Sequence, residues 1–313
     1  MPLRVGILSV EHMHVWSYVG ALRTDPRTEL VGFWDADEAR AGSFAEQTGV
    51  PYIGFRDDLL DAVDAVMVCS SNTSHADLIE AAANKGKAVL CEKPIGVSEE
   101  DFARIAAAAE KVPVMTAFPC RFSPAFAELK ARVAAGEIGT VRAISATNRG
   151  RCPFGWFVEE EKSGGGAMID HTVHVADLLL DLLGEEPADV AAFTGHNMYG
   201  QAWEDTAVVS MRYPSGVAAT LDASWSRPGN YKTWGDVTMR VVGDAGVLDL
   251  DMFGQGLQHY AKDGHHELGT VPDLDAAMVD EFISAASEKR TPRVSAADGI
   301  AAARVALRGY ASL

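Results

Sequence analysis

Short apolar stretches alternate with amphipathic ones along the first third of the chain. The apolar stretches have the length of buried strands: Arg4–Ser9, Leu30–Asp35, Ala65–Cys69, Ala88–Cys91 and Val114–Ala117. The stretches between them show helical spacing of apolar residues: His14–Arg23, Ala36–Thr48, His75–Lys85 and Glu99–Lys111. Apolar strands that alternate with helices predict an α/β fold with a doubly wound parallel sheet. Such sheets bind ligands at the carboxyl ends of their strands, so the polar residues after each strand are candidates for chemistry.

The pattern changes after Arg121. Strand-like runs then dominate: Val141–Thr147, Val190–Thr194, Thr206–Tyr213, Val217–Trp225, Val237–Val242 and Val247–Asp251. Turn sequences such as Pro214–Gly216 separate neighbouring runs, as in antiparallel hairpins. Helices are predicted at Ala125–Ala135, Ala167–Leu183, Ala276–Lys289 and Ala296–Tyr310. We therefore predict two domains: residues 1–121 with the parallel sheet, and residues 122–313 with an α+β fold and an open, mainly antiparallel sheet.

Composition narrows the class of protein. A net charge of −17 over 313 residues argues against nucleic acid and anionic membranes as partners, because both require clustered Lys and Arg. No apolar run reaches the roughly 20 residues of a membrane helix, and the N-terminus has no signal-peptide pattern. The four cysteines include no C-x-x-C pair and are interpreted as reduced thiols of a cytoplasmic protein: Cys69, Cys91, Cys120 and Cys152.

The turn after the first strand lacks the glycines of a dinucleotide-binding loop. Gly6 lies within the strand, but Ser9, Glu11 and His14 stand at the three positions of G-x-G-x-x-G. Those glycines let the backbone approach a pyrophosphate closely. Glu11 opposes the phosphates unless its side chain turns away, and His12 or His14 could compensate. The turn therefore leaves nucleotide binding and metal binding both open.

Asp35 ends the second predicted strand. A carboxylate at this point of the motif hydrogen-bonds the hydroxyls of the adenine ribose. Together with Asp37 it repels a 2′-phosphate, which favours NAD over NADP. The alternative for Asp35 is an ordinary turn at the end of a strand.

Two further polar clusters follow later strands. Ser70, Asn72 and His75 follow the third strand and either line a cofactor groove or cap the next helix. Glu92 and Lys93 follow the fourth strand and point toward the same crevice. Lys93 is a candidate proton donor or relay, and the Lys93–Pro94 bond is a candidate cis peptide.

A glycine run opens the helix that carries Asp170, His171 and His174. Asp170 and His174 are four residues apart and share one helical face. A histidine oriented by a carboxylate can remove a proton from a hydroxyl group. The alternative is an acidic residue that stabilises the helix dipole, next to a packed histidine.

Three segments together resemble the Gfo/Idh/MocA family of oxidoreductases. Gly86–Pro94 is similar to its A-G-K-x-V-x-x-E-K-P signature, and Gly164–His174 is similar to G-G-G-A-x-x-D-x-x-x-H. Phe118–Pro124 is similar to the aromatic–Arg–Phe segment between the two domains. The segments occur in the family's order, and the resemblance covers nearly the whole chain.

The resemblance implies an N-terminal Rossmann domain that binds NAD(P), and a second domain that binds substrate and forms a homodimer or homotetramer through its sheet. The substrates it implies are sugars, inositols and related polyols. The catalytic residues are then Lys93, Asp170 and His174. His174 removes the hydroxyl proton, Asp170 orients the imidazole of His174, and Lys93 hydrogen-bonds the substrate oxygen.

The predicted binding residues complete the hypothesis, with NAD as cofactor and no metal. The cofactor would contact Gly6, Ser9, His12, Asp35, Ser70, Asn72, His75, Glu92, Lys93 and Arg121. The substrate would contact His14, Asn148, Trp156 and His171. Aromatic residues of the second domain, such as Trp156, either stack on a sugar or fill the core.

Two rival hypotheses use the same residues. In the first, imidazoles and carboxylates hold zinc or manganese for a lyase, isomerase or hydrolase; its candidate ligands are Glu11, His12, His14, Asp170, His171 and His174. In the second, the protein senses a sugar or nucleotide without catalysis.

Overall fold

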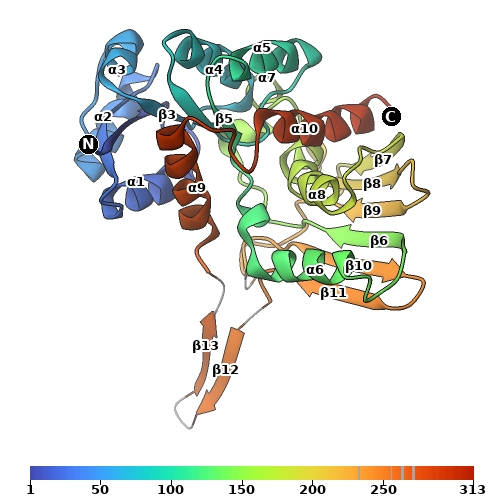
Figure 1. Cartoon of the computed structure of the whole chain (residues 1–313). Helices are drawn as coiled ribbons and strands as arrows, with labels where there is room; N and C mark the ends of the chain where they lie inside the picture. The colour runs from blue at the N-terminus through green and yellow to red at the C-terminus, as the bar shows by residue number, and fades with distance from the viewer. Residues whose placement is uncertain (232, 255, 262–263, 270–271) are drawn as a thin grey trace.

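The structure is a computed structural model that describes residues 1–231, 233–254, 256–261, 264–269 and 272–313. Figure 1 shows two sheets side by side, with the N-terminus beside the first and the C-terminus beside the second. The predicted α/β class with two sheets is confirmed. In the described part of the chain, no helix is both long and apolar enough to cross a bilayer.

The first sheet has five parallel strands in the order β2-β1-β3-β4-β5. These strands are β1 (Leu3–Leu8), β2 (Thr28–Trp34), β3 (Ala65–Val68), β4 (Ala88–Cys91) and β5 (Val114–Thr116). An isolated parallel bridge joins Tyr52 to Phe33 of β2 and extends this edge by one residue. With that bridge counted as a strand, the order is the 3-2-1-4-5-6 of the Rossmann fold, whose ligand crevice lies where the order reverses.

Helices cover both faces of this sheet: α1 (Val15–Thr24), α2 (Glu38–Thr48), α3 (Arg56–Ala62), α4 (His75–Asn84) and α5 (Glu99–Ala109). Their ends follow local sequence signals. Asp37 caps α2 by accepting from the backbone N–H groups of Ala39 and Arg40, and Gly49 ends α2 with a φ of 68°. The short helix α3 was not predicted, because seven residues are too few for a clear helical period.

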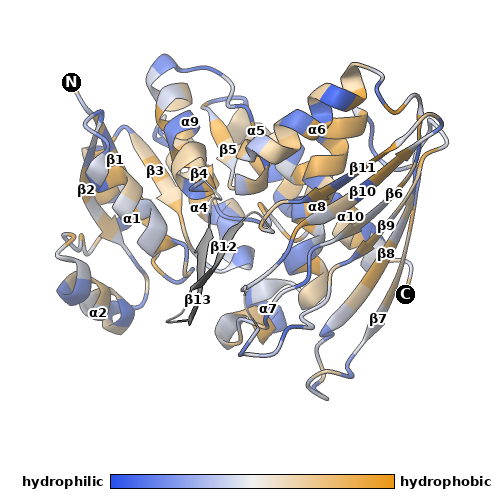
Figure 2. Ribbon diagram, turned by 90° about the horizontal axis from the view of Figure 1, so that it is seen from below, coloured by the Kyte–Doolittle hydropathy of each residue, from blue (hydrophilic) through white to orange (hydrophobic). Residues whose placement is uncertain are grey.

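The second sheet has six strands in the order β11-β10-β6-β9-β8-β7. They are β6 (Val141–Thr147), β7 (Asp189–Gly195), β8 (Thr206–Arg212), β9 (Ala218–Asp222), β10 (Thr238–Gly243) and β11 (Val247–Asp251). Only the pair β6–β9 is parallel among these described strands. Figure 2 shows the helices α6 (Pro124–Ala134) and α8 (Ala167–Leu183) on one side of this sheet. The sheet is therefore mainly antiparallel, as predicted.

The last two helices return toward the first domain. The helix α9 (Leu274–Glu288) packs on α1, where Ser17 donates to Asp275 at 2.8 Å. The helix α10 (Ala296–Tyr310) lies against α8 and α5. The division between residues 1–121 and 122–313 stays a prediction, since the end of the chain contacts both parts.

A hairpin extends away from both sheets in Figure 1. It consists of the antiparallel strands β12 (Gly256–Ala261) and β13 (Gly264–Gly269). The sequence predicts no strand there, since these segments contain no β-branched residues.

Candidate active site

A cavity of about 490 Å³ lies between the carboxyl ends of the first sheet and the second domain. The first domain contributes His12 and His14, which follow β1, and Lys93, which follows β4. The second domain contributes Asn148, Asp170, His171 and His174. The structure thus brings residues that are far apart in the sequence to one place.

Lys93 and Asp170 form an ion pair across the domain interface. The Nζ atom of Lys93 lies 2.5 Å from Oδ1 of Asp170, and both side chains are at least nine-tenths buried. Burial alone would raise the pKa of Asp170, but the charge of Lys93 outweighs burial and holds it well below its usual value. The Lys93–Pro94 peptide is cis, as predicted.

Asp170 contacts His171 rather than His174, which corrects the predicted pairing. Its second oxygen, Oδ2, accepts from Nε1 of Trp225 at 3.0 Å and lies 3.3 Å from Nε2 of His171. Although Asp170 and His174 share a face of α8, the carboxylate is already engaged by Lys93, Trp225 and His171. Asp170 therefore positions Lys93 and His171.

His174 stands apart from this network. Its ring packs edge-on against Phe118 at 5.8 Å between centroids, and its Nδ1 is buried with no hydrogen-bond partner among the described residues. Burial, and then the nearby charge of Lys93, lower the pKa of His174 well below its usual value. His174 is therefore neutral near pH 7.

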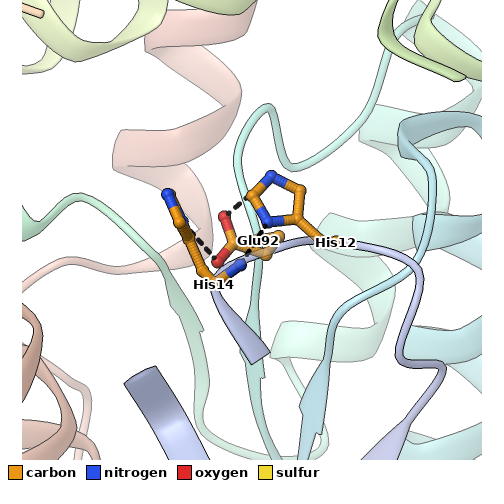
Figure 3. A group of neighbouring side chains, drawn as sticks. All are labelled: His12, His14 and Glu92. Carbon is orange, nitrogen blue, oxygen red and sulfur yellow. Dashed lines mark hydrogen bonds and ion pairs between the residues drawn. The ribbon is translucent and has the colours of Figure 1, made fainter. Parts of the chain in front are cut away.

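Figure 3 shows the side chains of His12, His14 and Glu92 gathered together. His12 and His14 line the cavity. Glu92 is buried and accepts from Tyr18. One of its oxygens, Oε1, lies 3.1 Å from Nδ1 of His14, and the other, Oε2, lies 3.7 Å from Nε2 of His12. These three residues form the candidate metal group that the described residues contain. This group differs from the predicted ligand set. It includes Glu92, which was not predicted as a metal ligand, and it lacks Glu11, Asp170, His171 and His174.

The glycine-less turn keeps the shape of a dinucleotide loop. Ser9, at the first glycine position, has a φ of 64°, a conformation that favours glycine. Its hydroxyl donates to Asp35 at 2.9 Å, which ties the turn to the end of β2. The carboxylate of Glu11 points to Arg40 at 3.2 Å and accepts from the backbone of Ser71 at 3.2 Å. Glu11 is therefore paired within the first domain.

Both halves of the chain match one family. Residues 5–118 match the model of the oxidoreductase family with an NAD-binding Rossmann fold, and residues 126–249 match the GFO/IDH/MocA C-terminal domain. The chain belongs to the Gfo/Idh/MocA family. The predicted NAD-dependent oxidoreductase with a Rossmann domain is confirmed at this level.

Known members are similar over most of the chain. The uncharacterized oxidoreductase YrbE of Bacillus subtilis is 30% identical over 72% of this chain and 67% of its own length. A myo-inositol 2-dehydrogenase of Thermotoga maritima is 32% identical over 71% of this chain and 67% of its own. The crystal structure of a probable dehydrogenase from Thermotoga maritima superposes with a TM-score of 0.84 at 27% identity, covering 99% of this chain and 96% of that one.

In this Gfo/Idh/MocA member, the residues of the glycine-less turn and of the end of β2 are compatible with bound NAD. Because Glu11 pairs with Arg40, its charge does not face the start of α1. His14 precedes α1 without capping it by its side chain. The N–H of Val15 already donates to the carbonyl of His12, so the next N–H groups of the first turn are the ones that can bind a diphosphate. Asp35 stands at the ribose position, where it now accepts from Arg40 at 2.8 Å. A ribose at this point would replace that guanidinium.

Four predicted cofactor residues build the walls of the crevice rather than line the cavity. A Cβ on Gly6 would come within 2.9 Å of Leu59, so this glycine permits close packing under the sheet. Both ring nitrogens of His75 face backbone carbonyls, at 2.8 and 3.2 Å. The side-chain amide of Asn72 donates to Ser163 at 2.8 Å, and the hydroxyl of Ser70 donates to the neighbouring carbonyl at 3.0 Å.

Two other predictions need correction. Arg121 is 4% exposed and pairs with Asp177, Asp181 and Asp298 at the domain junction, because a buried guanidinium needs carboxylate partners. Trp156 lies outside the lining of the cavity. Its indole donates to the backbone of Glu11 at 3.3 Å.

Asp236 is among the cavity-lining residues that sequence reasoning missed. Phe157, one of the second-domain aromatic residues considered for stacking on a sugar, also lines the cavity. Phe157 stacks on Trp156 with centroids 3.9 Å apart. Asp236 accepts from Arg149 and Arg227 at 2.9 and 2.8 Å. No local motif marks Asp236, since its partners come from other segments of the chain.

Proposed function

We propose that this Gfo/Idh/MocA oxidoreductase oxidises a hydroxyl carbon of a sugar, an inositol or a related polyol. The observation that carries this proposal is a set of buried polar atoms without partners beside Lys93. Among the described residues that line the cavity, these atoms are His12 Nε2, Asn148 Oδ1, His171 Nδ1 and His174 Nδ1. Buried polar atoms are normally hydrogen-bonded. A polyhydroxylated molecule in this cavity would supply the missing donors and acceptors.

The chain's own residues divide the chemistry between them. His174, neutral and facing the cavity, removes the proton of the substrate hydroxyl. Lys93 donates to the same oxygen and stabilises its developing charge, while Asp170 holds Lys93 in place. NAD, when bound, supplies the nicotinamide carbon that accepts the hydride. In the reverse direction His174 returns the proton to a carbonyl oxygen.

The first domain would hold NAD along the crevice at its strand ends. The start of α1 faces the diphosphate, and Asp35 accepts from the adenine ribose. NAD is favoured over NADP because Asp35 and Asp37 stand together at this position. The pKa of Asp35 stays below its usual value despite burial, mainly through Arg40 and backbone N–H groups, so its negative charge persists at neutral pH.

Calorimetry with NAD and NADP, followed by turnover on a panel of inositols and sugars, tests the proposal. We expect NAD to bind more tightly, and at least one polyol to be oxidised. Lys93→Met and His174→Ala should each lower kcat by about 100-fold or more. Lys85→Met and His196→Ala serve as controls, since both residues are exposed and neither lines the cavity. Full activity of either active-site variant would refute its role.

The second sheet supports a further proposal, a homodimer or homotetramer. Helices of the second domain cover one side of this sheet. On the opposite side, Phe193 is 72% exposed to solvent and Val208 is 44% exposed. These two residues are direct cross-strand partners and form an apolar spot at the centre of the pair β7–β8.

A further inference from the structure

His12 lies in the glycine-less turn, where its surroundings leave it little freedom. Its side chain is 1% exposed and lies beside the rings of His14, Phe157 and Trp156, with centroids 4.5, 5.3 and 5.8 Å away. Its backbone N–H donates to Cys69 at 2.9 Å, and its carbonyl accepts from Val15 at 3.1 Å. The imidazole is therefore held in one place at the end of β1.

One hydrogen bond decides which ring nitrogen of His12 carries the proton. The backbone N–H of His14 donates to Nδ1 of His12 at 3.2 Å. A backbone nitrogen can only donate, so Nδ1 must offer its lone pair. In the neutral ring the proton is then on Nε2.

That proton has no acceptor among the described residues. Nε2 of His12 is buried and makes no hydrogen bond. The oxygen Oε2 of Glu92 lies 3.7 Å away, beyond hydrogen-bond distance, and it already accepts from the backbone of Lys93 at 3.2 Å. The other oxygen of Glu92 is taken by Tyr18 and His14.

We propose that His12 is a substrate-contacting residue whose Nε2–H donates a hydrogen bond to an oxygen of the bound polyol. His12 lines the same cavity as Lys93 and His174, and the inference rests on the function proposed above. Burial lowers the pKa of His12 to about 3, so the ring is neutral and carries a single N–H. It supplements the charged donor Lys93 with a neutral one, fixed before substrate binds.

The same three side chains also resemble a metal site, with ligand atoms of His12, His14 and Glu92 within 4.8 Å of one another. A cation on Nε2 of His12 would need the lone pair there and the proton on Nδ1. That proton would face the N–H of His14, so two donors would meet. The hydrogen bond in place thus favours the donor role, and the metal becomes an outcome of the test.

The tautomer can be read from the ¹⁵N spectrum of histidine-labelled protein, with His12→Gln used to assign the signal. We expect His12 to be neutral with its proton on Nε2 from pH 5 to pH 9. A proton on Nδ1, or stoichiometric Zn²⁺ binding that His12→Ala abolishes and His196→Ala retains, would overturn the inference.

Steady-state kinetics on the polyol of the panel with the highest kcat/KM test the contact between His12 and the substrate. His12→Ala should lose about 100-fold in kcat/KM, whereas His12→Gln, which keeps a side-chain N–H, should recover most of it. The pH profile of both variants should keep its wild-type shape, since His12 does not titrate. Thermal unfolding of each variant separates misfolding from a lost contact.

The two proposals fail in different ways. An active wild type whose His12→Ala variant is equally active contradicts only the role of His12. A wild type that oxidises no polyol contradicts the proposed function, and the substrate role of His12 with it.

Discussion

The carboxylate of Asp170 has Lys93 at one oxygen, and Trp225 and His171 at the other. All of these side chains are buried, so each depends on the others for charge or hydrogen bonds. The sequence pointed to Lys93, Asp170 and His174 through short motifs. It could not show that Asp170 contacts His171, because adjacent residues on a helix do not normally face each other, whereas residues four apart do.

Replacing Asp170 by Asn should cost about 3–5 kcal/mol of unfolding free energy, because it leaves the ammonium of Lys93 buried without a counter-charge. Urea unfolding at pH 7 measures this loss. The double variant Lys93→Met/Asp170→Asn removes both charges and should recover part of it. A single variant as stable as the wild type would show that the pair is not buried.

The same ion pair predicts how stability depends on acid. The pKa of Asp170 in the folded state is well below its unfolded value, so its contribution is present above about pH 4 and is lost as the pH falls further. Between pH 5 and pH 2.5, the free energy of unfolding measured in urea should therefore fall less steeply for Asp170→Asn than for the wild type. Equal slopes would contradict this assignment.

Among the elements, η2 (Pro119–Phe122), α8 and α10 meet around Arg121. Three carboxylates surround this one guanidinium, and Lys130 offers a second cation to Asp181 at 2.6 Å. Sequence patterns placed these helices within a few residues, since their periods and end signals are local. The pairing of Arg121 with Asp177 joins residues distant in the chain, so no local pattern revealed it.

This junction should make the protein less stable as the pH rises. Burial, and then the charges of Asp298 and Asp181, raise the pKa of Asp177 to about 7 despite Arg121. Because the pKa of Asp177 is higher in the folded state than in the unfolded state, this group stabilises the folded protein at low pH. That contribution to the free energy of unfolding is lost as the pH approaches 7. Between pH 5 and pH 8, Tm should fall more in the wild type than in Asp177→Asn. A parallel fall in both proteins would exclude this group as the cause.

At the scale of the whole molecule, the cavity exists only because the two domains lie side by side. His12 and Lys93 come from one side of the cavity and His174 from the other. The open side of the second sheet remains available to another copy of the chain.

In the proposed homodimer or homotetramer, a charge on that open side should separate the copies. Phe193→Asp puts a carboxylate at the centre of the exposed strands and should shift the mass measured by light scattering toward the monomer. Phe55→Asp is the matched control, because Phe55 is similarly exposed, at 74%, on the first domain. An unchanged mass for Phe193→Asp would place the interface elsewhere.

The sequence by itself determined the alternation of strands and helices, the change to an antiparallel sheet and the motifs around Lys93 and Asp170. These are local patterns, governed by side-chain periodicity and by turn residues. Only the tertiary structure decided what the glycine-less turn does: Glu11 pairs with Arg40, Glu92 approaches His14, and Nε2 of His12 is left buried without a partner among the described residues. These outcomes depend on which distant side chains compete for the same charge or hydrogen bond, and that competition is settled only when the chain is folded.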